Sequence, residues 1–126
     1  ILGMEIVSYS QFINPNIVKI VNNPEGEILY CSRSPIPYCK KFSKKMEAKR
    51  VYAIFAFRYH FLKKYNKLKL SRLEEIESCG QNRVCENTKG MYVTPYKYKP
   101  SFSVDTNSDL KLVNKLIVKD SLIQKY

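Results

Sequence analysis

Short β-branched runs dominate the hydrophobic pattern in the first half of the chain. Residues 16–21 (Asn-Ile-Val-Lys-Ile-Val) form one such run, and residues 27–31 form another after Pro24-Glu25-Gly26. Proline and glycine between two runs of this kind favour a turn, so residues 16–31 are predicted to form a β-hairpin. Residues 51–57 are apolar throughout, which predicts a strand buried on both faces of a sheet.

After residue 58, the spacing of apolar residues changes from the pattern of a strand to that of a helix. Four apolar or aromatic residues recur at i, i+1, i+4 and i+7, which places them on one helical face. These residues are Phe61, Leu62, Tyr65 and Leu68. Residues 91–98 return to a strand pattern, although Pro95 is tolerated only at an edge or an irregular position.

Two pairs of residues have the spacing of a helix capping box. Ser71 and Glu74 form the first pair, in which the serine oxygen accepts from the Glu74 N–H while the glutamate reaches back. This pair is predicted to open a helix that contains Gly80 and has an apolar side formed by Leu73, Ile76 and Val84. Thr106 and Asp109 form the second pair and are predicted to open a final helix.

The predicted order of elements is β-β-loop-β-α-α-β-α, which indicates an α/β protein. The chain has 126 residues, which is an ordinary size for one domain. No apolar run approaches the roughly 18–20 residues that a membrane helix needs. Residues 1–5 lack the basic start of a signal peptide, so no membrane partner and a cytoplasmic location are expected.

The charge is strongly positive, with 22 basic residues against 11 acidic ones and a net charge of +11. A positive charge of this size makes nucleic acid a candidate partner. However, 17 of the basic residues are lysines, and arginine is the residue suited to bidentate recognition of phosphate and guanine. We therefore expect no nucleic-acid partner and interpret the basic residues between 38 and 50 as a surface loop.

Few residues have the pattern of a catalytic or metal site. The chain has four cysteines without a C-x-x-C pair and a single histidine, His60, which disfavours a zinc site and indicates reduced thiols. No phosphate-binding glycine loop or nucleophile elbow is present. Asp105 could cap the final helix or hold a divalent cation, and its position favours the cap. Arg33, on a loop stiffened by Pro35 and Pro37, is either an anion clamp or an ordinary surface arginine.

Several motifs resemble one family, the 3-deoxy-manno-octulosonate cytidylyltransferases (CMP-Kdo synthetases). The chain is similar to the second half of these enzymes from about Ser10 to Ile117. The motifs occur in the family's order: Asn14-Pro-Asn-Ile-Val-Lys19, Ile28-Leu-Tyr-Cys-Ser-Arg-Ser-Pro-Ile-Pro37, Ile54-Phe-Ala-Phe-Arg58, Leu73-Glu-Glu-Ile-Glu77 with Gln81 and Arg83, and Ser103-Val-Asp-Thr106 with Asp109-Leu110. CMP-sialic acid synthetases are more distant relatives.

The resemblance implies the C-terminal half of a mixed-sheet, Rossmann-like nucleotidyltransferase fold, usually homodimeric. It implies a Mg²⁺-dependent transfer of CMP from CTP to the sugar acid Kdo, which serves lipopolysaccharide biosynthesis. By resemblance, Asp105 is a magnesium ligand, Arg33 contacts the sugar acid, and Gln81 lines the sugar pocket. No residue of this chain is assigned a catalytic role.

The sequence also departs from the family. Val51, Phe55 and Gly80 stand where the family has a histidine, a tyrosine and a glutamate, and each change removes a polar group from the sugar pocket. The phosphate-cradling loop and the cytosine pocket belong to the family's N-terminal half, which these residues do not include. Residues 1–126 are therefore expected to be a single partial domain with a tail at 118–126, truncated or diverged and inactive alone. Two alternatives are a non-catalytic dimerisation or interaction module that pairs with a full-length synthetase and, less favoured, a basic nucleic-acid-binding domain. The expected protein partner is a second copy of the chain or a separate N-terminal half.

Overall fold

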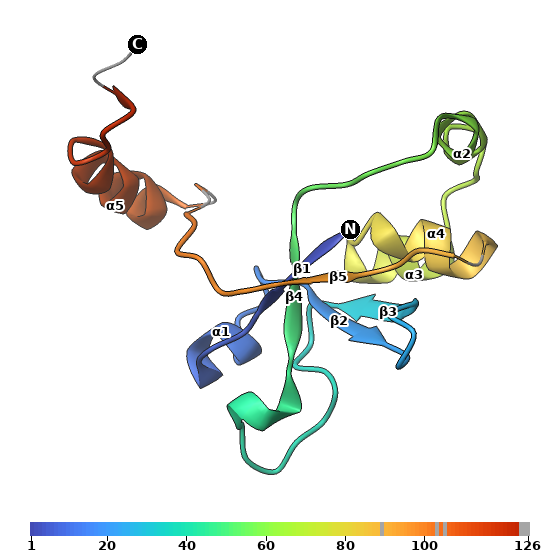
Figure 1. Ribbon diagram of the computed structural model, residues 1–126, viewed down its shortest axis with the longest axis horizontal. Coiled ribbons are helices and arrows are strands. Elements are labelled where there is room, and N and C mark those ends of the chain that lie inside the picture. Colours follow the sequence, from blue (N-terminus) through green and yellow to red (C-terminus); the bar gives the residue numbers. More distant parts are fainter. Residues whose placement is uncertain (89, 103, 105, 124–126) are drawn as a thin grey trace.

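The protein is built on a mixed five-stranded sheet with short helices around it (Figure 1). The computed structural model describes residues 1–88, 90–102, 104 and 106–123. The strands lie in the order β3-β2-β4-β1-β5, and they are β1 (Leu2–Glu5), β2 (Lys19–Asn22), β3 (Ile28–Ser32), β4 (Lys49–Tyr52) and β5 (Thr94–Tyr96). Only β1 and β5 pair in parallel, whereas the β1–β4, β2–β3 and β2–β4 pairs are antiparallel. The predicted α/β class is confirmed.

The predicted hairpin is present as β2 and β3. The turn between them places Gly26 at φ 84°, a left-handed conformation that glycine adopts without strain. Ile20 opposite Cys31 and Val21 opposite Tyr30 continue the ladder until the register shifts between Val21 and Asn22. Local sequence signals were sufficient here because both strands and their turn lie within one short segment.

The prediction of a buried strand over residues 51–57 is wrong after Tyr52. Tyr52 pairs with Leu2, the first residue of β1. The Leu2 N–H also donates to the Ile54 carbonyl at 3.3 Å, after which the chain leaves the sheet. Ile54, Phe55 and Phe57 are 55%, 40% and 41% exposed. The apolar run 51–57 is therefore longer than the part of it that pairs with β1.

Two elements near the N-terminus escaped prediction from the sequence. β1 lies between β4 and β5, and a side chain at Gly3 would collide with Val93, which explains the glycine at this close approach. Helix α1 (Tyr9–Ile13) follows, and the Ser8 hydroxyl caps it by accepting from the backbone N–H of Gln11 at 3.3 Å.

Two small apolar clusters form most of the core in the described part of the chain. Ile20, Ile28, Cys31 and Val93 form one cluster, against which Val51 packs. The second cluster consists of Ile6, Phe12 and Ala48, with Ile17, Cys39, Phe42 and Met46 packed against it. The basic segment 38–50 is therefore anchored to the core by apolar side chains, while Lys40, Lys41, Lys44 and Lys45 are exposed.

The remaining helices are α2 (Tyr59–Tyr65), α3 (Arg72–Glu77), α4 (Gln81–Asn87) and α5 (Asn107–Ile117). The second predicted capping box is present in full at α5, where Thr106 and Asp109 each hydrogen-bond the other's backbone. Figure 1 shows α5 standing apart from the sheet, with the chain leading to it from β5. No helix in the described ranges has the length and apolar character needed to cross a membrane.

Candidate functional site

Helices α3 and α4 form a pair that the sequence predicted as one helix. The helix breaks at Ser78, which has a left-handed φ of 48°, and Gly80 becomes the N-cap residue of α4 instead of an interior position. The prediction of a continuous helix through Gly80 is therefore wrong. The break turns the chain so that Gln81 opens a new helix.

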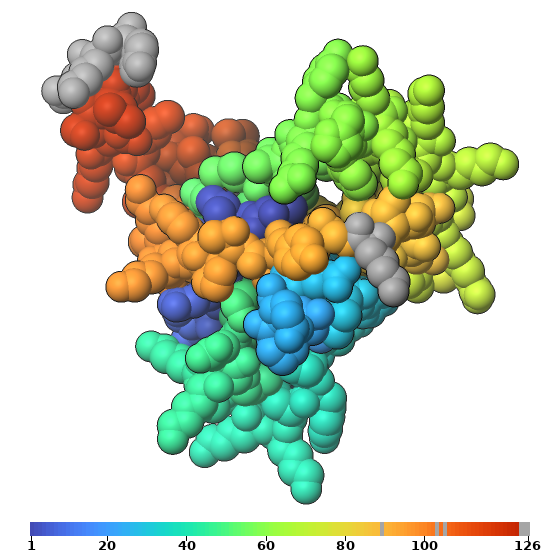
Figure 2. Space-filling view, turned by 45° about the vertical axis from the view of Figure 1, so that its right-hand side comes forward, coloured from blue at the N-terminus to red at the C-terminus, as the bar shows by residue number. Residues whose placement is uncertain are grey.

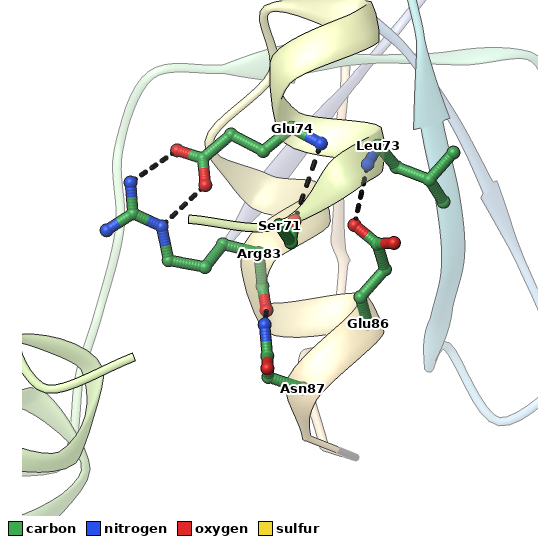
Figure 3. Close-up of polar contacts among 6 residues, drawn as sticks. All are labelled: Ser71, Leu73, Glu74, Arg83, Glu86 and Asn87. Carbon is green, nitrogen blue, oxygen red and sulfur yellow. Dashed lines mark hydrogen bonds and ion pairs between the residues drawn. The ribbon is translucent and has the colours of Figure 1, made fainter. Parts of the chain in front are cut away.

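The capping box predicted for Ser71 and Glu74 is only half formed (Figure 3). The Ser71 hydroxyl accepts from the Glu74 N–H at 3.4 Å as expected. The Glu74 carboxylate instead binds the Arg83 guanidinium through two bonds of 2.5 and 2.6 Å, and these bonds lower the pKa of Glu74. Glu86 of α4 accepts from a different backbone donor in the first turn of α3, the Leu73 N–H, at 2.9 Å.

Arg33 connects three segments of the chain through main-chain carbonyls. Its guanidinium donates to the carbonyl oxygens of Glu77 at 3.0 Å, Ser78 at 3.2 Å and Pro15 at 3.0 Å. A guanidinium has five N–H groups, so two remain available within the part of the chain that the structure describes. The predicted contact of Arg33 with a sugar acid stays a prediction. Its hydrogen bonds to the Glu77 and Ser78 carbonyls, in the turn before Gln81, are observed.

The Glu77 carboxylate completes this connection from the side of α3. It accepts from Tyr30 Oη at 2.5 Å, Ser32 Oγ at 2.7 Å and the Arg33 backbone N–H at 3.0 Å. Burial opposes ionisation of Glu77, but these hydrogen bonds outweigh it, so the pKa lies below its ordinary value of 4.5. The same bond from Tyr30 raises the pKa of the tyrosine.

Lys19 is fully buried beneath the Arg33 loop. Its ammonium donates to the carbonyl oxygens of Asn14 at 2.9 Å and Ile17 at 2.7 Å, and also to that of Arg33. These bonds use all three ammonium protons. Burial, followed by the nearby Arg33 charge, lowers the pKa of Lys19. Lys19 thus fixes the loop that carries Arg33 rather than facing a ligand.

A cavity of about 750 Å³ lies next to the α3–α4 turn. Residues 55–58, 60 and 61 and Tyr65 line it on one side, and Gly80, Gln81, Val84 and residues 90–92 line it on another. Figure 2 shows it as a gap between the green residues after β4 and the orange residues that lead into β5. Its size suits a small molecule.

The structure brings some of the predicted site residues together at this cavity and leaves others apart. Gln81 lines it, as do Phe55 and Gly80, two positions at which the sequence departs from the family. Val51 lies in β4 and packs against the core, and Arg33 is not among the lining residues. Asp105 lies outside the described residues.

Sequence reasoning missed Arg58 and His60 as cavity residues. Arg58 is the N-cap residue of α2, and His60 lies in its first turn. Both line the cavity, whereas His60 entered the sequence analysis only as the single histidine that disfavours a zinc site. The sequence signal that could have identified Arg58 and His60 is their position directly after the apolar run 51–57, whose last residues also line the cavity.

Comparison of the sequence with known proteins identifies the family to which the chain belongs. A sequence model of the cytidylyltransferase family matches residues 1–91, and the chain belongs to that family. Among its relatives are 3-deoxy-manno-octulosonate cytidylyltransferases, which are 40% identical in Thermodesulfovibrio yellowstonii, 36% in Vibrio vulnificus and 33% in Haemophilus influenzae. These matches cover 92%, 95% and 94% of this chain and 47%, 50% and 51% of the respective relatives.

A solved structure gives the same result for the fold. The structure of a CMP:2-keto-3-deoxy-manno-octonic acid synthetase complexed with CTP superimposes with a TM-score of 0.73 and 31% identity over 94% of this chain and 48% of that one. The predicted family resemblance and nucleotidyltransferase fold are thereby confirmed. The chain spans about half the length of the relatives it matches.

Proposed function

We propose that the chain supplies the sugar-acid-binding half of a cytidylyltransferase that transfers CMP from CTP to Kdo in the cytoplasm, for lipopolysaccharide biosynthesis. The main support is a similarity that extends over more than nine tenths of this chain to relatives with that named activity. The cavity beside Gln81 provides a site of suitable size for the sugar. Arg33 and Gln81 are the proposed sugar-acid contacts.

We further propose that these 126 residues are inactive by themselves. Transfer from a nucleoside triphosphate depends on groups that neutralise and position the phosphates. In the ranges that the structure describes, no three histidine, cysteine or acidic residues cluster to hold a metal ion. The phosphate-cradling loop expected from the family resemblance is not among these residues.

Magnesium and its proposed ligand Asp105 belong to the same proposal. Proteins usually hold Mg²⁺ through one or two carboxylates while substrate phosphates supply further ligands, so a single aspartate fits this role by its chemistry. Its neighbour Asp109 is engaged in the cap of α5. The remaining ligands would therefore come from CTP and from the other half of the site, and magnesium would supply charge neutralisation.

A pyrophosphate-release assay with CTP, Kdo and Mg²⁺ tests this function. We expect no turnover by the chain alone and turnover after addition of the N-terminal half of a relative. Asp105→Asn should abolish the restored turnover, while Asn107→Asp, a neighbouring exposed position, should preserve it. Turnover by the chain alone would contradict the proposed inactivity, and failure of every N-terminal half to restore turnover would contradict the proposed function.

Exposed apolar surface favours a second function, that of a non-catalytic module that pairs with a full-length synthetase or another copy. Ile54 and Phe57 are exposed after β4, and Leu110, Leu112 and Leu116 are 45%, 45% and 38% exposed on α5. Apolar area of this kind is typical of interaction surfaces. Size-exclusion chromatography with light scattering, with and without a full-length synthetase, tests this pairing function. A chain that stays monomeric and does not bind the synthetase would contradict it.

A further inference from the structure

The basic segment 38–50 carries a dense positive charge. Six of its thirteen residues are lysine or arginine, and Glu47 is its only acidic residue, so the charge is not balanced within the segment. Four of its lysines are exposed: Lys40, Lys41, Lys44 and Lys45. The ion pair found within the described ranges joins Arg83 to Glu74, and no carboxylate pairs with these lysines there. Their charge is therefore available to a partner.

Apolar side chains hold this segment against the body of the protein. Cys39, Phe42 and Met46 pack against the core cluster that contains Phe12. The ring centroids of Phe12 and Phe42 are 5.5 Å apart. The exposed lysines lie between these inward positions in the sequence, so the same packing that anchors the segment directs its charges towards solvent.

A short 3₁₀ helix (Lys44–Met46) orders the middle of the segment. The Ser43 hydroxyl caps it by accepting from the Lys45 N–H at 3.3 Å. The Glu47 N–H then donates to the Lys44 carbonyl at 3.0 Å and ends the turn. Because the backbone is already ordered, binding through this segment costs less conformational entropy than binding through a free loop would.

The segment projects from the molecule on the side away from the cavity. Figure 1 shows it extending beyond β4 on the side opposite α2, and Figure 2 shows its teal side chains pointing outwards. Within the described ranges, no residue of the segment lines the cavity. A projecting surface of this kind can contact a flat partner while the cavity beside Gln81 stays open.

The chemistry of the segment favours an anionic lipid surface over nucleic acid. Recognition of nucleic acid relies on arginine forks and stacked aromatic rings, but the one arginine of the segment, Arg50, lies in β4 and donates to Ser101 at 3.3 Å. Lysines act as point charges without a fixed geometry, and each adds about a fivefold gain in binding near an anionic membrane. Tyr38 is 86% exposed, and tyrosine suits a membrane–water interface.

We propose that the basic segment is a docking site for an anionic lipid surface, which its four exposed lysines contact while Tyr38 lies at the interface. Docking of this kind is peripheral and needs no membrane-crossing helix. The sequence-based expectation of no membrane partner rested on the lack of such a helix, and peripheral docking revises it. Docking is independent of the proposed transferase function, because the segment is separate from the cavity.

Co-sedimentation of the 126-residue chain with lipid vesicles tests the docking site. Vesicles of phosphatidylcholine with roughly 30% phosphatidylglycerol supply the anionic surface, and vesicles of phosphatidylcholine alone are the neutral control. We expect binding to the anionic vesicles only. Raising NaCl from about 0.1 M to about 1 M shortens the screening length from about 10 Å to about 3 Å and should release the chain.

Two variants with the same loss of charge locate the site. The segment variant, Lys40→Gln/Lys41→Gln/Lys44→Gln/Lys45→Gln, should bind anionic vesicles at least about a hundredfold more weakly. The control variant changes four exposed lysines in and after α2, Lys63→Gln/Lys64→Gln/Lys67→Gln/Lys69→Gln, and should bind less than about tenfold more weakly. Circular dichroism of both variants checks that the fold is retained.

Four outcomes would overturn the proposal: no binding to anionic vesicles, equal binding to neutral vesicles, unchanged binding of the segment variant, or an equal loss in both variants. A single-stranded oligonucleotide and poly-glutamate are titrated in the same buffer. If either binds more tightly than the vesicles and loses its binding in the segment variant, the segment belongs to that partner and lipid docking is refuted. Turnover is not measured, so failure here leaves the proposed transferase function intact.

Discussion

The side chain of Asn82 hydrogen-bonds both backbone polar groups of Cys31. The Cys31 N–H donates to Asn82 Oδ1 at 3.1 Å, and Asn82 Nδ2 donates to the Cys31 carbonyl at 2.9 Å. Cys31 lies on β3, an edge strand of the sheet, and both residues are fully buried. Asn82 therefore occupies the place of a neighbouring strand and joins α4 to the sheet edge, close to Gln81.

We expect Asn82→Ala to lower the free energy of unfolding by about 2–4 kcal/mol, because it leaves two buried backbone groups without partners. Urea denaturation followed by circular dichroism measures the change. Asn87→Ala is the matched control, since Asn87 is exposed and its side chain donates to the Arg83 carbonyl of its own helix at 2.9 Å. Equal effects of the two substitutions would show that the contact with Cys31 contributes little.

Lys19→Met should destabilise the protein by about 3 kcal/mol. The methionine keeps much of the side-chain volume but leaves three carbonyl oxygens without the ammonium that now satisfies them. Lys45→Met, on the exposed part of the basic segment, is the control and should cost less than about 0.5 kcal/mol. A tolerated Lys19→Met would indicate that water replaces the ammonium beneath the Arg33 loop.

Glu77 should make stability depend on pH in the acidic range. Because its pKa is lower in the folded protein than the ordinary 4.5, the folded state gains stability above pH 4.5 and loses it as pH falls below that value. Glu74, with a pKa lowered mainly by its bonds to Arg83, acts in the same direction. Urea denaturation at pH 7 and at lower pH values should show this decline.

Glu77→Gln isolates the contribution of this carboxylate. The variant should be less stable by about 1–2 kcal/mol at pH 7, because the bonds from Tyr30, Ser32 and Arg33 lose their charged acceptor. Its stability should also decline less steeply on acidification. Glu75→Gln, at an exposed position of the same helix, should retain the steep decline. An unchanged pH dependence in Glu77→Gln would assign the acid sensitivity to other groups.

Sequence reasoning succeeded where short-range interactions determine the structure. The hairpin follows from β-branched runs around Gly26, and the cap of α5 follows from the spacing of Thr106 and Asp109. Both features are formed by residues within one short segment. The relationship of the whole chain to a family was likewise carried by motifs in a fixed order.

Long-range pairing explains what the sequence did not reveal. Strand β1 has only four residues, and its partners are 49–52 and 94–96, far away in the sequence. Residues 53–57 have the composition of a buried strand. They are exposed because the register of β1 with β4 ends at Tyr52, and the composition of the run does not reveal this end. The cavity is assembled from residues around 55–61, 80–84 and 90–94, so no local spacing could group Arg58 with Gln81.

The four cysteines should differ sharply in their reactivity towards a thiol reagent. All four are free, but Cys31 and Cys79 are buried, and burial raises the pKa of both thiols. Burial also raises the pKa of Cys85 to about 11. Because the thiolate is the reactive form, these three cysteines should be protected in the folded protein at pH 7.

Labelling with iodoacetamide at pH 7, followed by mass spectrometry of peptides, measures this protection. Cys39 and Cys85 are both partly buried, and we expect Cys39 to be modified first and Cys85, whose pKa is raised, more slowly, while Cys31 and Cys79 follow at the rate of unfolding. In urea above the unfolding midpoint, all four should react at similar rates. Cys39→Ser should remove the fast phase and leave the slow one, whereas fast labelling of Cys31 in the folded protein would contradict its burial beneath the Asn82 contact.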